Sequence, residues 1–226
     1  PEAFTFENYP EAFRQLDFIR TLANSLLITV SSVIIIVIFS AMAAYALERI
    51  KSKFSTVTFM VFVAAMLVPF QSVMIPLVAL FGKAQMLNQI GIIFMYLGFG
   101  GSMSIFLYHG AMKSIPRALD EAAIIDGASR WQVFWKVIFP MLKPTTVTVA
   151  VLNTMWIWND YLLPSLVINS PTTQTIPLKM FFFFGQYTKQ WHLALAGLVI
   201  AILPVIIFYF FMQKQIIKGV ADGAVK

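Results

Sequence analysis

The stretch Ser114–Pro144, SIPRALDEAAIIDGASRWQVFWKVIFPMLKP, decides the fold, because it is the longest polar helical segment in an otherwise mostly apolar chain. Pro116 predicts a helix start, since proline fits a first turn whose backbone N–H groups lack partners anyway. Gly127 predicts the end of that helix, because glycine adopts the left-handed cap at little cost. Ser129 predicts the cap of a second helix, with Gln132 as its reciprocal partner. We therefore expect a helix–turn–helix between two hydrophobic spans.

The composition around this stretch is that of a membrane protein. The chain has 226 residues, of which 59% are hydrophobic and 12% are charged, about half the charged fraction of a soluble domain. It has no cysteine, which excludes a disulfide framework and thiol chemistry. The net charge of +6 does not indicate nucleic acid, because basic residues also mark membrane edges. We expect an all-α, polytopic transmembrane bundle that forms a single domain over residues 1–226.

Five hydrophobic segments are long enough to cross a bilayer, which takes about twenty residues. They cover approximately residues 22–47, 56–80, 90–112, 145–167 and 193–212. Pro69 and Pro76 interrupt the second span and Pro204 interrupts the last, and such breaks are tolerated where neighbours re-satisfy the backbone. The second span is therefore either a kinked wall of a translocation path or a kinked packing helix.

The fourth span carries polar and aromatic side chains that suit a sugar. Asn153, Trp156, Asn159 and Asp160 supply amides, an indole ring and a carboxylate, and these groups pair with hydroxyls and stack on apolar sugar faces. Helical spacing predicts that Asn153, Trp156 and Asp160 share one face, and an ionisable residue at membrane depth usually faces a cavity or a partner. They are our candidates for a substrate path, whereas Trp158 and Tyr161 favour an aromatic belt at the outer interface.

The basic residues predict which ends of the spans are cytoplasmic. If the C-terminal end is inside, eleven of the sixteen Lys and Arg residues are cytoplasmic: Arg49, Lys51, Lys53, Lys113, Arg117, Arg130, Lys136, Lys143, Lys214, Lys218 and Lys226. This orientation places residues 114–144 and a tail at 213–226 in the cytoplasm, and a loop at 169–192 outside. It also places Pro1 outside, so we expect a sixth span to precede it.

The central stretch resembles a known motif. Glu121–Ala128, EAAIIDGA, followed by Phe134, Pro140 and Pro144, resembles the EAA loop of ABC-importer permeases. More narrowly, it is similar to the second permease subunit of carbohydrate importers, the smaller one in the maltose system. Asn24-Ser25-Leu26 and the C-terminal tail are also similar to this family, so the resemblance extends from Phe4 to Lys226.

This resemblance implies roles for three sets of residues. The coupling loop would dock on an ATPase subunit through Glu121, Ala122, Ala123, Asp126 and Gly127. The tail would reach between two ATPases, with contacts at Lys218, Gly219 and Gly223. The external loop would contact a substrate-binding protein through Gln186, Tyr187 and Trp191.

The resemblance also implies the partners and the reaction. We expect a second homologous permease, two ATPases and an extracellular or periplasmic sugar-binding protein, assembled in a bacterial or archaeal cytoplasmic membrane. The chain has no Gly-x-x-x-x-Gly-Lys-Ser/Thr phosphate loop, so it is expected to be a transport subunit, not an enzyme, with ATP and Mg²⁺ bound by the partner ATPase. We expect no cofactor or metal in the chain, since neither His109 nor His192 has a ligand at helical spacing. The substrate class implied is a carbohydrate, in particular an oligosaccharide.

Two other classes of protein remain as alternatives. A secondary transporter driven by an ion gradient would show paired repeats and several buried ionisable groups, whereas only Asp160 stands within a span and no internal repeat is visible. An intramembrane enzyme would need a carboxylate or metal constellation, and Asp160 has no evident partner in the sequence. Dependence of uptake on ATP separates the importer from the secondary transporter.

Overall fold

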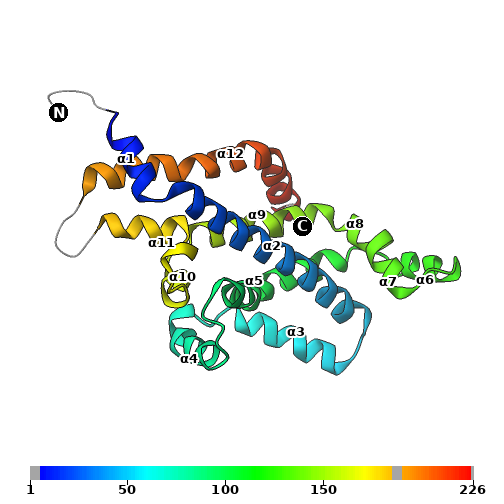
Figure 1. Ribbon diagram of the computed structural model, residues 1–226. Coiled ribbons are helices and arrows are strands. Elements are labelled where there is room, and N and C mark those ends of the chain that lie inside the picture. The colour runs from blue at the N-terminus through cyan, green and yellow to red at the C-terminus, as the bar shows by residue number, and fades with distance from the viewer. Residues whose placement is uncertain (1–5, 185–189, 225–226) are drawn as a thin grey trace.

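The computed structural model describes residues 6–184 and 190–224, and for residues 211, 212 and 214–224 it describes the backbone alone. Over these residues the chain is helical and contains no β-strand (Figure 1). The longer helices are α1 (Asn8–Gln15), α2 (Phe18–Arg49), α3 (Lys53–Ala65), α4 (Phe70–Lys83), α5 (Gln89–Met112), α6 (Ala118–Ile125), α9 (Lys143–Asn159) and α12 (Trp191–Ala224). The shorter ones are α7 (Arg130–Gln132), η1 (Val133–Ile138), α8 (Phe139–Met141), α10 (Leu162–Val167), η2 (Pro171–Thr173), α11 (Ile176–Met180) and η3 (Phe181–Phe183).

The centre of the bundle is the contact between α2, α5 and α9. Buried apolar residues of all three helices form one core, among them Ile36, Tyr96 and Val149. Gly100 in α5 allows the close approach, because a Cβ there would lie 2.4 Å from Asn153 Oδ1 and 2.7 Å from Ile36 Cδ1. Small residues serve this purpose in membrane helices, since packing rather than the hydrophobic effect holds them together.

The structure confirms the all-α membrane fold. Three helical segments are long and apolar enough to cross a membrane: Phe18–Arg49, Gln89–Met112 and Trp191–Phe210. They contain the first and third predicted spans and nearly all of the last. Two further crossings are possible among the described residues only if each of two bent helix pairs is counted as one span.

The second predicted span is one of these bent pairs, and the expectation of a single kinked helix is wrong. The axes of α3 and α4 differ by 105°. Pro69 caps α4 in an extended conformation, with ψ at 140°, because a proline and the residue before it disfavour continuation of a helix. Pro76 lies inside α4 without ending it. Only one of the two prolines therefore breaks the segment.

The fourth predicted span also differs from the expectation. Its main helix α9 ends at Asn159, and Leu162–Val167 forms the separate short helix α10. Asp160 lies beyond the last turn with extended backbone angles, φ −72° and ψ 125°. It accepts a hydrogen bond from Leu162 N at 3.0 Å and thereby starts the next helix. The predicted common face is not lost by this break, because Asn153 contacts Ser104 and both Trp156 and Asp160 contact Tyr96, so all three side chains face α5.

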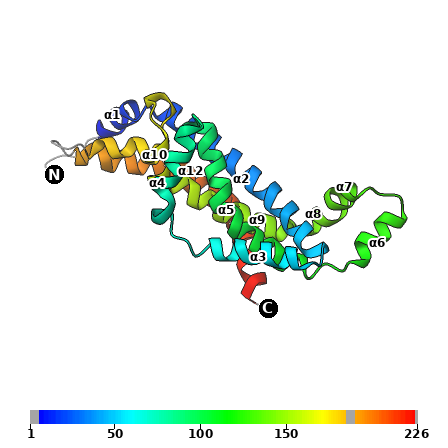
Figure 2. The same ribbon diagram turned by 90° about the horizontal axis from the view of Figure 1, so that it is seen from below.

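A second, smaller core lies at the end of the molecule where the chain begins. Here α1 and the first turns of α12 pack together with α11 and η3 around Ala12, Leu16, Met180, Phe183 and Leu193. Both views show α1 and α6 at opposite ends of α2 (Figures 1 and 2). The short helix η3 lies in the run of four phenylalanines, Phe181–Phe184, and follows α11.

Candidate functional site

The segment from α6 to α8 projects from one end of the bundle (Figures 1 and 2). The predicted turn at Gly127 is confirmed, because its φ is +88°. Gly127 N donates to Ile124 O at 2.9 Å, and Ala128 N donates to Ala123 O at 3.0 Å. This pair of bonds closes the end of α6 and requires the left-handed conformation that favours glycine. The predicted start is less accurate, since α6 begins at Ala118, beyond Pro116.

The second helix of the projecting segment begins with the predicted capping box. Ser129 N donates to Gln132 Oε1 at 2.8 Å, and Gln132 N donates to Ser129 Oγ at 3.3 Å. The helix then widens into the π-helical turn η1, followed by α8. Pro140 lies inside α8 and does not end it, and the chain turns at Leu142. Proline has no N–H for the carbonyl of Lys136, four residues earlier, which removes one bond of a regular α-helix.

The projecting segment is held to the end of α2 by a buried charge cluster. Asp120 is 8% exposed and forms an ion pair with Arg49, whose Nη2 lies 2.8 Å from Asp120 Oδ2. Tyr45 Oη donates to Asp120 Oδ1 at 2.7 Å, and Arg49 Nη2 donates to Ile115 O at 3.2 Å. Arg117 Nη2 donates to Glu48 O at 2.6 Å. The base of the segment is therefore tied to α2 by four contacts that are at least partly shielded from water, two to the Asp120 carboxylate and two to backbone carbonyls.

The sequence did not predict this cluster. Arg49 was expected only to mark a cytoplasmic membrane edge, and Tyr45 was not among the predicted site residues. The available signal was that Tyr45 and Arg49 are four residues apart, and so share a helical face at the end of a span. Aromatic packing adds to the anchorage, because the Tyr45 and Phe134 rings have centroids 5.4 Å apart and Trp135 lies edge-on to Phe134.

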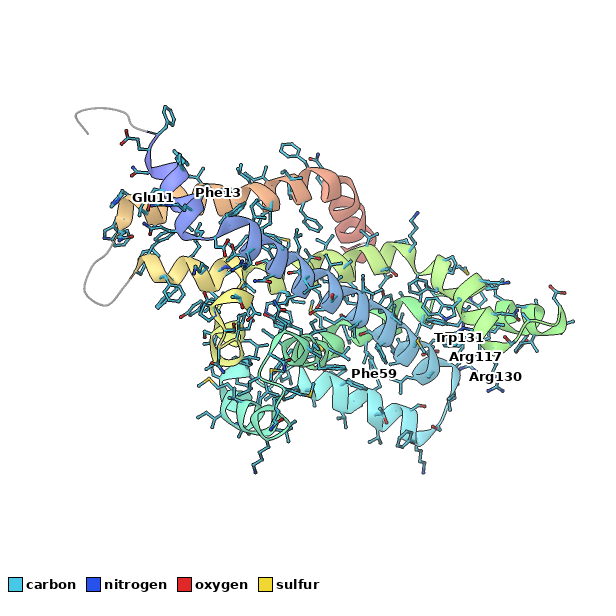
Figure 3. All side chains as sticks on the ribbon, in the orientation of Figure 1. Glu11, Phe13, Phe59, Arg117, Arg130 and Trp131 are labelled. Atoms are coloured by element: carbon cyan, nitrogen blue, oxygen red, sulfur yellow. The ribbon has the colours of Figure 1, made fainter. Side chains whose placement is uncertain are left out.

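The tip of the segment is accessible and partly apolar. Of the predicted coupling residues, Glu121, Ala122, Asp126 and Gly127 are exposed and Ala123 is half-buried, so the structure brings all five to one tip. Large apolar side chains surround them, with Ile124 49%, Ile125 84% and Trp131 59% exposed. Figure 3 shows Trp131 with Arg117 and Arg130 in this region, far from Glu11 and Phe13 at the other end of the molecule. An exposed apolar patch with charged neighbours is typical of a protein-binding surface.

The predicted path residues are divided between the core and the surface. Asn153 is 7% exposed, and its amide nitrogen donates to Ser104 Oγ at 3.1 Å and Val149 O at 2.8 Å. It therefore joins α9 to α5 in this chain and does not line an open space. Asn159 is exposed and donates to Met155 O in its own helix at 2.7 Å.

Trp156 and Asp160 meet around one tyrosine. Tyr96 Oη donates to Asp160 Oδ2 at 2.9 Å, and the Tyr96 and Trp156 rings pack edge to face with centroids 5.4 Å apart. Trp156 is 42% exposed and Tyr96 is fully buried. The exposed indole and the neighbouring carboxylate are thus held in place by a buried residue of α5. Tyr96 was not among the predicted site residues.

The other predicted contacts have less structural support. Gln186 and Tyr187 lie outside the described residues. Trp191 begins α12, is 56% exposed and packs edge to face on Phe184 at 5.4 Å. Lys218, Gly219 and Gly223 lie in the part of α12 for which only the backbone is described, so the predicted contacts of the tail remain predictions.

A pocket of about 700 Å³ lies beside the projecting segment, between the end of α2, α3 and the end of α5. His109 lines it, with Nε2 3.2 Å from Glu48 Oε2 and the ring stacked on Phe59 at 4.0 Å. The fold thus supplies a carboxylate partner for His109 that spacing within one helix could not reveal. No group of three potential metal ligands occurs among the residues described.

A helical membrane bundle with one accessible, firmly anchored loop is the architecture of a transporter's permease subunit. Comparison with solved structures agrees. A chain of a bacterial ABC transporter that imports the acidic polysaccharide alginate superposes with a TM-score of 0.80 at 26% identity, covering 93% of this chain and 79% of the other. A second alginate transporter structure, with its pentasaccharide-bound periplasmic protein, matches at a TM-score of 0.70 and 18% identity and so supports the fold alone.

The chain belongs to the family of binding-protein-dependent transport system inner membrane components, whose pattern matches residues 36–222. It is 57% identical to the probable starch degradation products transport system permease protein AmyC of Thermoanaerobacterium thermosulfurigenes, over all of this chain and 82% of AmyC. It is 39% identical to the multiple sugar-binding transport system permease protein MsmG of Streptococcus mutans, over 90% of this chain and 75% of MsmG. The protein is therefore a multi-pass membrane permease subunit.

Proposed function

We propose that the chain forms half of the translocation path of an ATP-driven importer for an oligosaccharide. The observation that carries this proposal is the projecting segment, which is anchored at Asp120 and exposed at Glu121, Ile125 and Trp131. A segment that is anchored at its base and exposed to solvent at its tip suits the binding of a partner subunit whose conformational change is transmitted to the bundle.

In this proposal the anchored segment transmits the work of an ATPase to the bundle. Closure of two ATPase subunits would displace the tip, where Glu121 would pair with an arginine of the ATPase. The buried contact of Asp120 with Arg49 and Tyr45 then obliges α2 to follow. The result is rigid-body switching between outward and inward access, driven by contacts that differ between the two states. ATP and Mg²⁺ would be bound by the ATPases.

The other half of the path would come from a second, homologous permease. Within this chain, Trp156 and Asp160 are the best candidates to face the substrate, because Tyr96 holds both and Trp156 remains exposed. An indole face and a carboxylate can stack on a sugar ring and accept from its hydroxyls. A sugar-binding protein outside the membrane would deliver the substrate to the external loop.

The relatives favour an oligosaccharide as the substrate class. AmyC is described as a permease for starch degradation products and MsmG as one for multiple sugars. The melibiose/raffinose/stachyose import permease MelC of Bacillus subtilis is 34% identical over the full chain. Melibiose, raffinose and stachyose, named for MelC, are oligosaccharides. The cytoplasmic membrane of a bacterium or archaeon is the proposed location.

Purification of the tagged full-length subunit in mild detergent, with mass spectrometry of the bound proteins, tests the assembly. We expect a second permease and an ATPase in the eluate, and loss of the ATPase when Glu121→Lys reverses the charge at the tip. Glu11→Lys is the control for charge reversal, since Glu11 is a partly exposed carboxylate on α1 at the opposite end of the molecule. A subunit that elutes alone in several detergents would overturn the proposal.

Uptake by the purified complex in lipid vesicles tests the energy source and the substrate. Labelled maltotriose and raffinose are suitable probes, with glucose as a monosaccharide control. We expect accumulation of a trisaccharide only with ATP at the ATPase side and insensitivity to an uncoupler. Uptake that follows an ion gradient without ATP would instead establish a secondary transporter, and chemical conversion of a lipid-linked sugar would establish an enzyme.

A further inference from the structure

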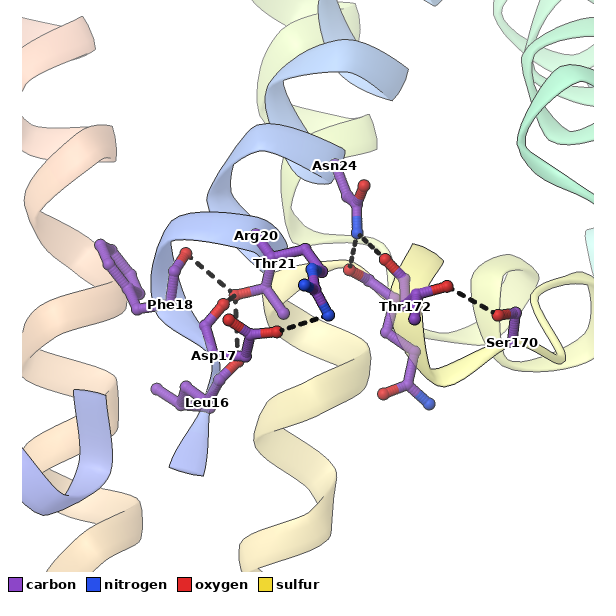
Figure 4. A network of polar contacts seen from close by, with 9 residues as sticks. Leu16, Asp17, Phe18, Arg20, Thr21, Asn24, Ser170 and Thr172 are labelled. Atoms are coloured by element: carbon purple, nitrogen blue, oxygen red, sulfur yellow. Dashed lines mark hydrogen bonds and ion pairs between the residues drawn. The ribbon is translucent and has the colours of Figure 1, made fainter. Parts of the chain in front are cut away.

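The end of α2 opposite the projecting segment holds a second loop. Asn24 lies near the start of α2, and its amide nitrogen donates to Thr172 O at 2.9 Å and to Gln174 O at 3.0 Å (Figure 4). Its amide oxygen accepts from Gln89 Nε2 at 3.1 Å. One asparagine side chain therefore joins α2, the first residue of α5 and the loop that follows α10.

Neighbouring side chains extend this clamp. Gln89 Nε2 also lies 3.4 Å from Thr173 O, and the buried Ser25 Oγ accepts from Ile176 N at 2.9 Å. Within residues 172–176, four backbone groups thus find partners on α2 and α5. Gln174 and Ile176 are buried, and backbone groups that are shielded from water need partners, so the bonds from Asn24 and to Ser25 decide where this part of the loop lies.

The two anchorages are on one uninterrupted helix. Asn24 and Arg49 are both in α2, and 25 residues of α-helix span about 37 Å at 1.5 Å per residue. At one end α2 is tied to the projecting segment through Asp120, and at the other it is tied to the external loop through Asn24. A displacement of α2 along or about its axis must therefore move both loops together, unless one of the two sets of contacts breaks.

We propose that Asn24 is a positioning residue that fixes the external loop, residues 169–184, to α2. The loop is thereby presented to the binding protein in a position set by the same helix that follows the ATPase. The proposal rests on the proposed function for its partners, whereas the fixation of the loop itself can be measured without transport.

The first measurement is the position of the loop. The chain contains no cysteine, so Leu27→Cys and Phe182→Cys, two exposed positions on α2 and η3, can carry spin labels in the purified complex. We expect one narrow distance distribution. Asn24→Asp keeps the acceptor for Gln89 but turns a carboxylate oxygen toward two carbonyls, so we expect the distribution to broaden. An unchanged, narrow distribution in Asn24→Asp would overturn the proposal.

The second measurement is the response of the ATPase to the binding protein. Loss of the clamp should raise the half-stimulating concentration of binding protein about tenfold, which corresponds to about 1.4 kcal/mol. Gln15→Ala is the control, because among the described residues the Gln15 amide bonds to Glu11 of its own helix alone, and it should match the wild type. A merely structural defect would lower the amount of complex and its maximal rate while leaving that concentration unchanged, and this outcome would also overturn the proposal.

The two measurements separate this inference from the proposed function. A wild-type complex that no binding protein stimulates would contradict the importer, yet its spin-label distances would still test the clamp. A stimulated wild type with no shift in Asn24→Asp would contradict the clamp alone.

Discussion

Replacement of Asp120 by alanine should release the projecting segment from α2. The Asp120 and Arg49 side chains are only 12% and 13% exposed, and their ion pair is 2.8 Å long. Asp120→Ala removes the carboxylate and leaves the Arg49 guanidinium unpaired in a site from which water is largely excluded. It also removes the acceptor of the 2.7 Å hydrogen bond from Tyr45.

The cost follows from the burial of the pair. Removal of one partner of a buried ion pair costs about 3–5 kcal/mol, because the remaining charge loses its compensation. Since both side chains keep some contact with water and Arg49 keeps its bond to Ile115 O, we expect a value near the lower limit, about 3 kcal/mol. The equilibrium between the anchored and released segment should then shift by about a hundredfold.

Hydrogen exchange of the purified subunit, read by mass spectrometry over residues 118–142, measures this shift. Amides of the segment should exchange about a hundredfold faster in Asp120→Ala, with little change in α12. Asp126→Ala is the matched control, because this exposed aspartate at the tip forms no side-chain hydrogen bond or ion pair among the described contacts. The double variant Arg49→Met/Asp120→Leu should recover most of the protection. Equal exchange in Asp120→Ala and Asp126→Ala would refute the reasoning.

Three further variants test other parts of the account. Gly100→Ala should destabilise the bundle by about 1–3 kcal/mol through overpacking and lower its Tm in detergent. Gly98→Ala is the control, because a Cβ there meets nothing within 4 Å, and equal Tm values for the two variants would contradict the close packing at Gly100. Gly127→Ala places a residue with a Cβ at a φ of +88°, which costs about 1–2 kcal/mol. The weakened turn should speed tryptic cleavage at Arg130, and an unchanged cleavage rate would argue against this turn. Because the Ile125 side chain is 84% exposed, Ile125→Asp should leave the Tm of the subunit within about one degree of the wild type. It should nevertheless reduce the amount of ATPase that co-purifies, and full recovery of the ATPase would exclude Ile125 from the docking surface.

Local features of the projecting segment could be predicted because their partners are near in sequence. The turn at Gly127 and the capping box of Ser129 and Gln132 are closed by bonds that reach no more than five residues. The anchorage could not be predicted in this way. Asp120 is 75 residues from Tyr45 and 71 from Arg49, so only the packing of α2 against the rest of the bundle brings them together.

The same distinction explains the errors in the spans. Hydropathy located five apolar segments, but it contains no information on the direction of the helix axes. The 105° bend between α3 and α4 depends on which proline the neighbouring helices can accommodate. Asp160 lies within an apolar segment, so a continuous helix was the natural expectation. Its hydrogen bonds with Leu162 N and Tyr96 Oη instead end α9 there.

The sequence by itself determined that this is a helical membrane protein with a polar helix–turn–helix, because composition, hydropathy and capping residues act over short distances. The resemblance of Glu121–Ala128 to the EAA loop implied the coupling residues, and the structure leaves Glu121 and Asp126 exposed. The tertiary structure decided how that tip is connected to the bundle. Asp120 and Asn24 each satisfy buried or half-buried polar groups on elements distant in sequence, and such pairs exist only once α2 has been packed, because helix packing sets which distant side chains meet.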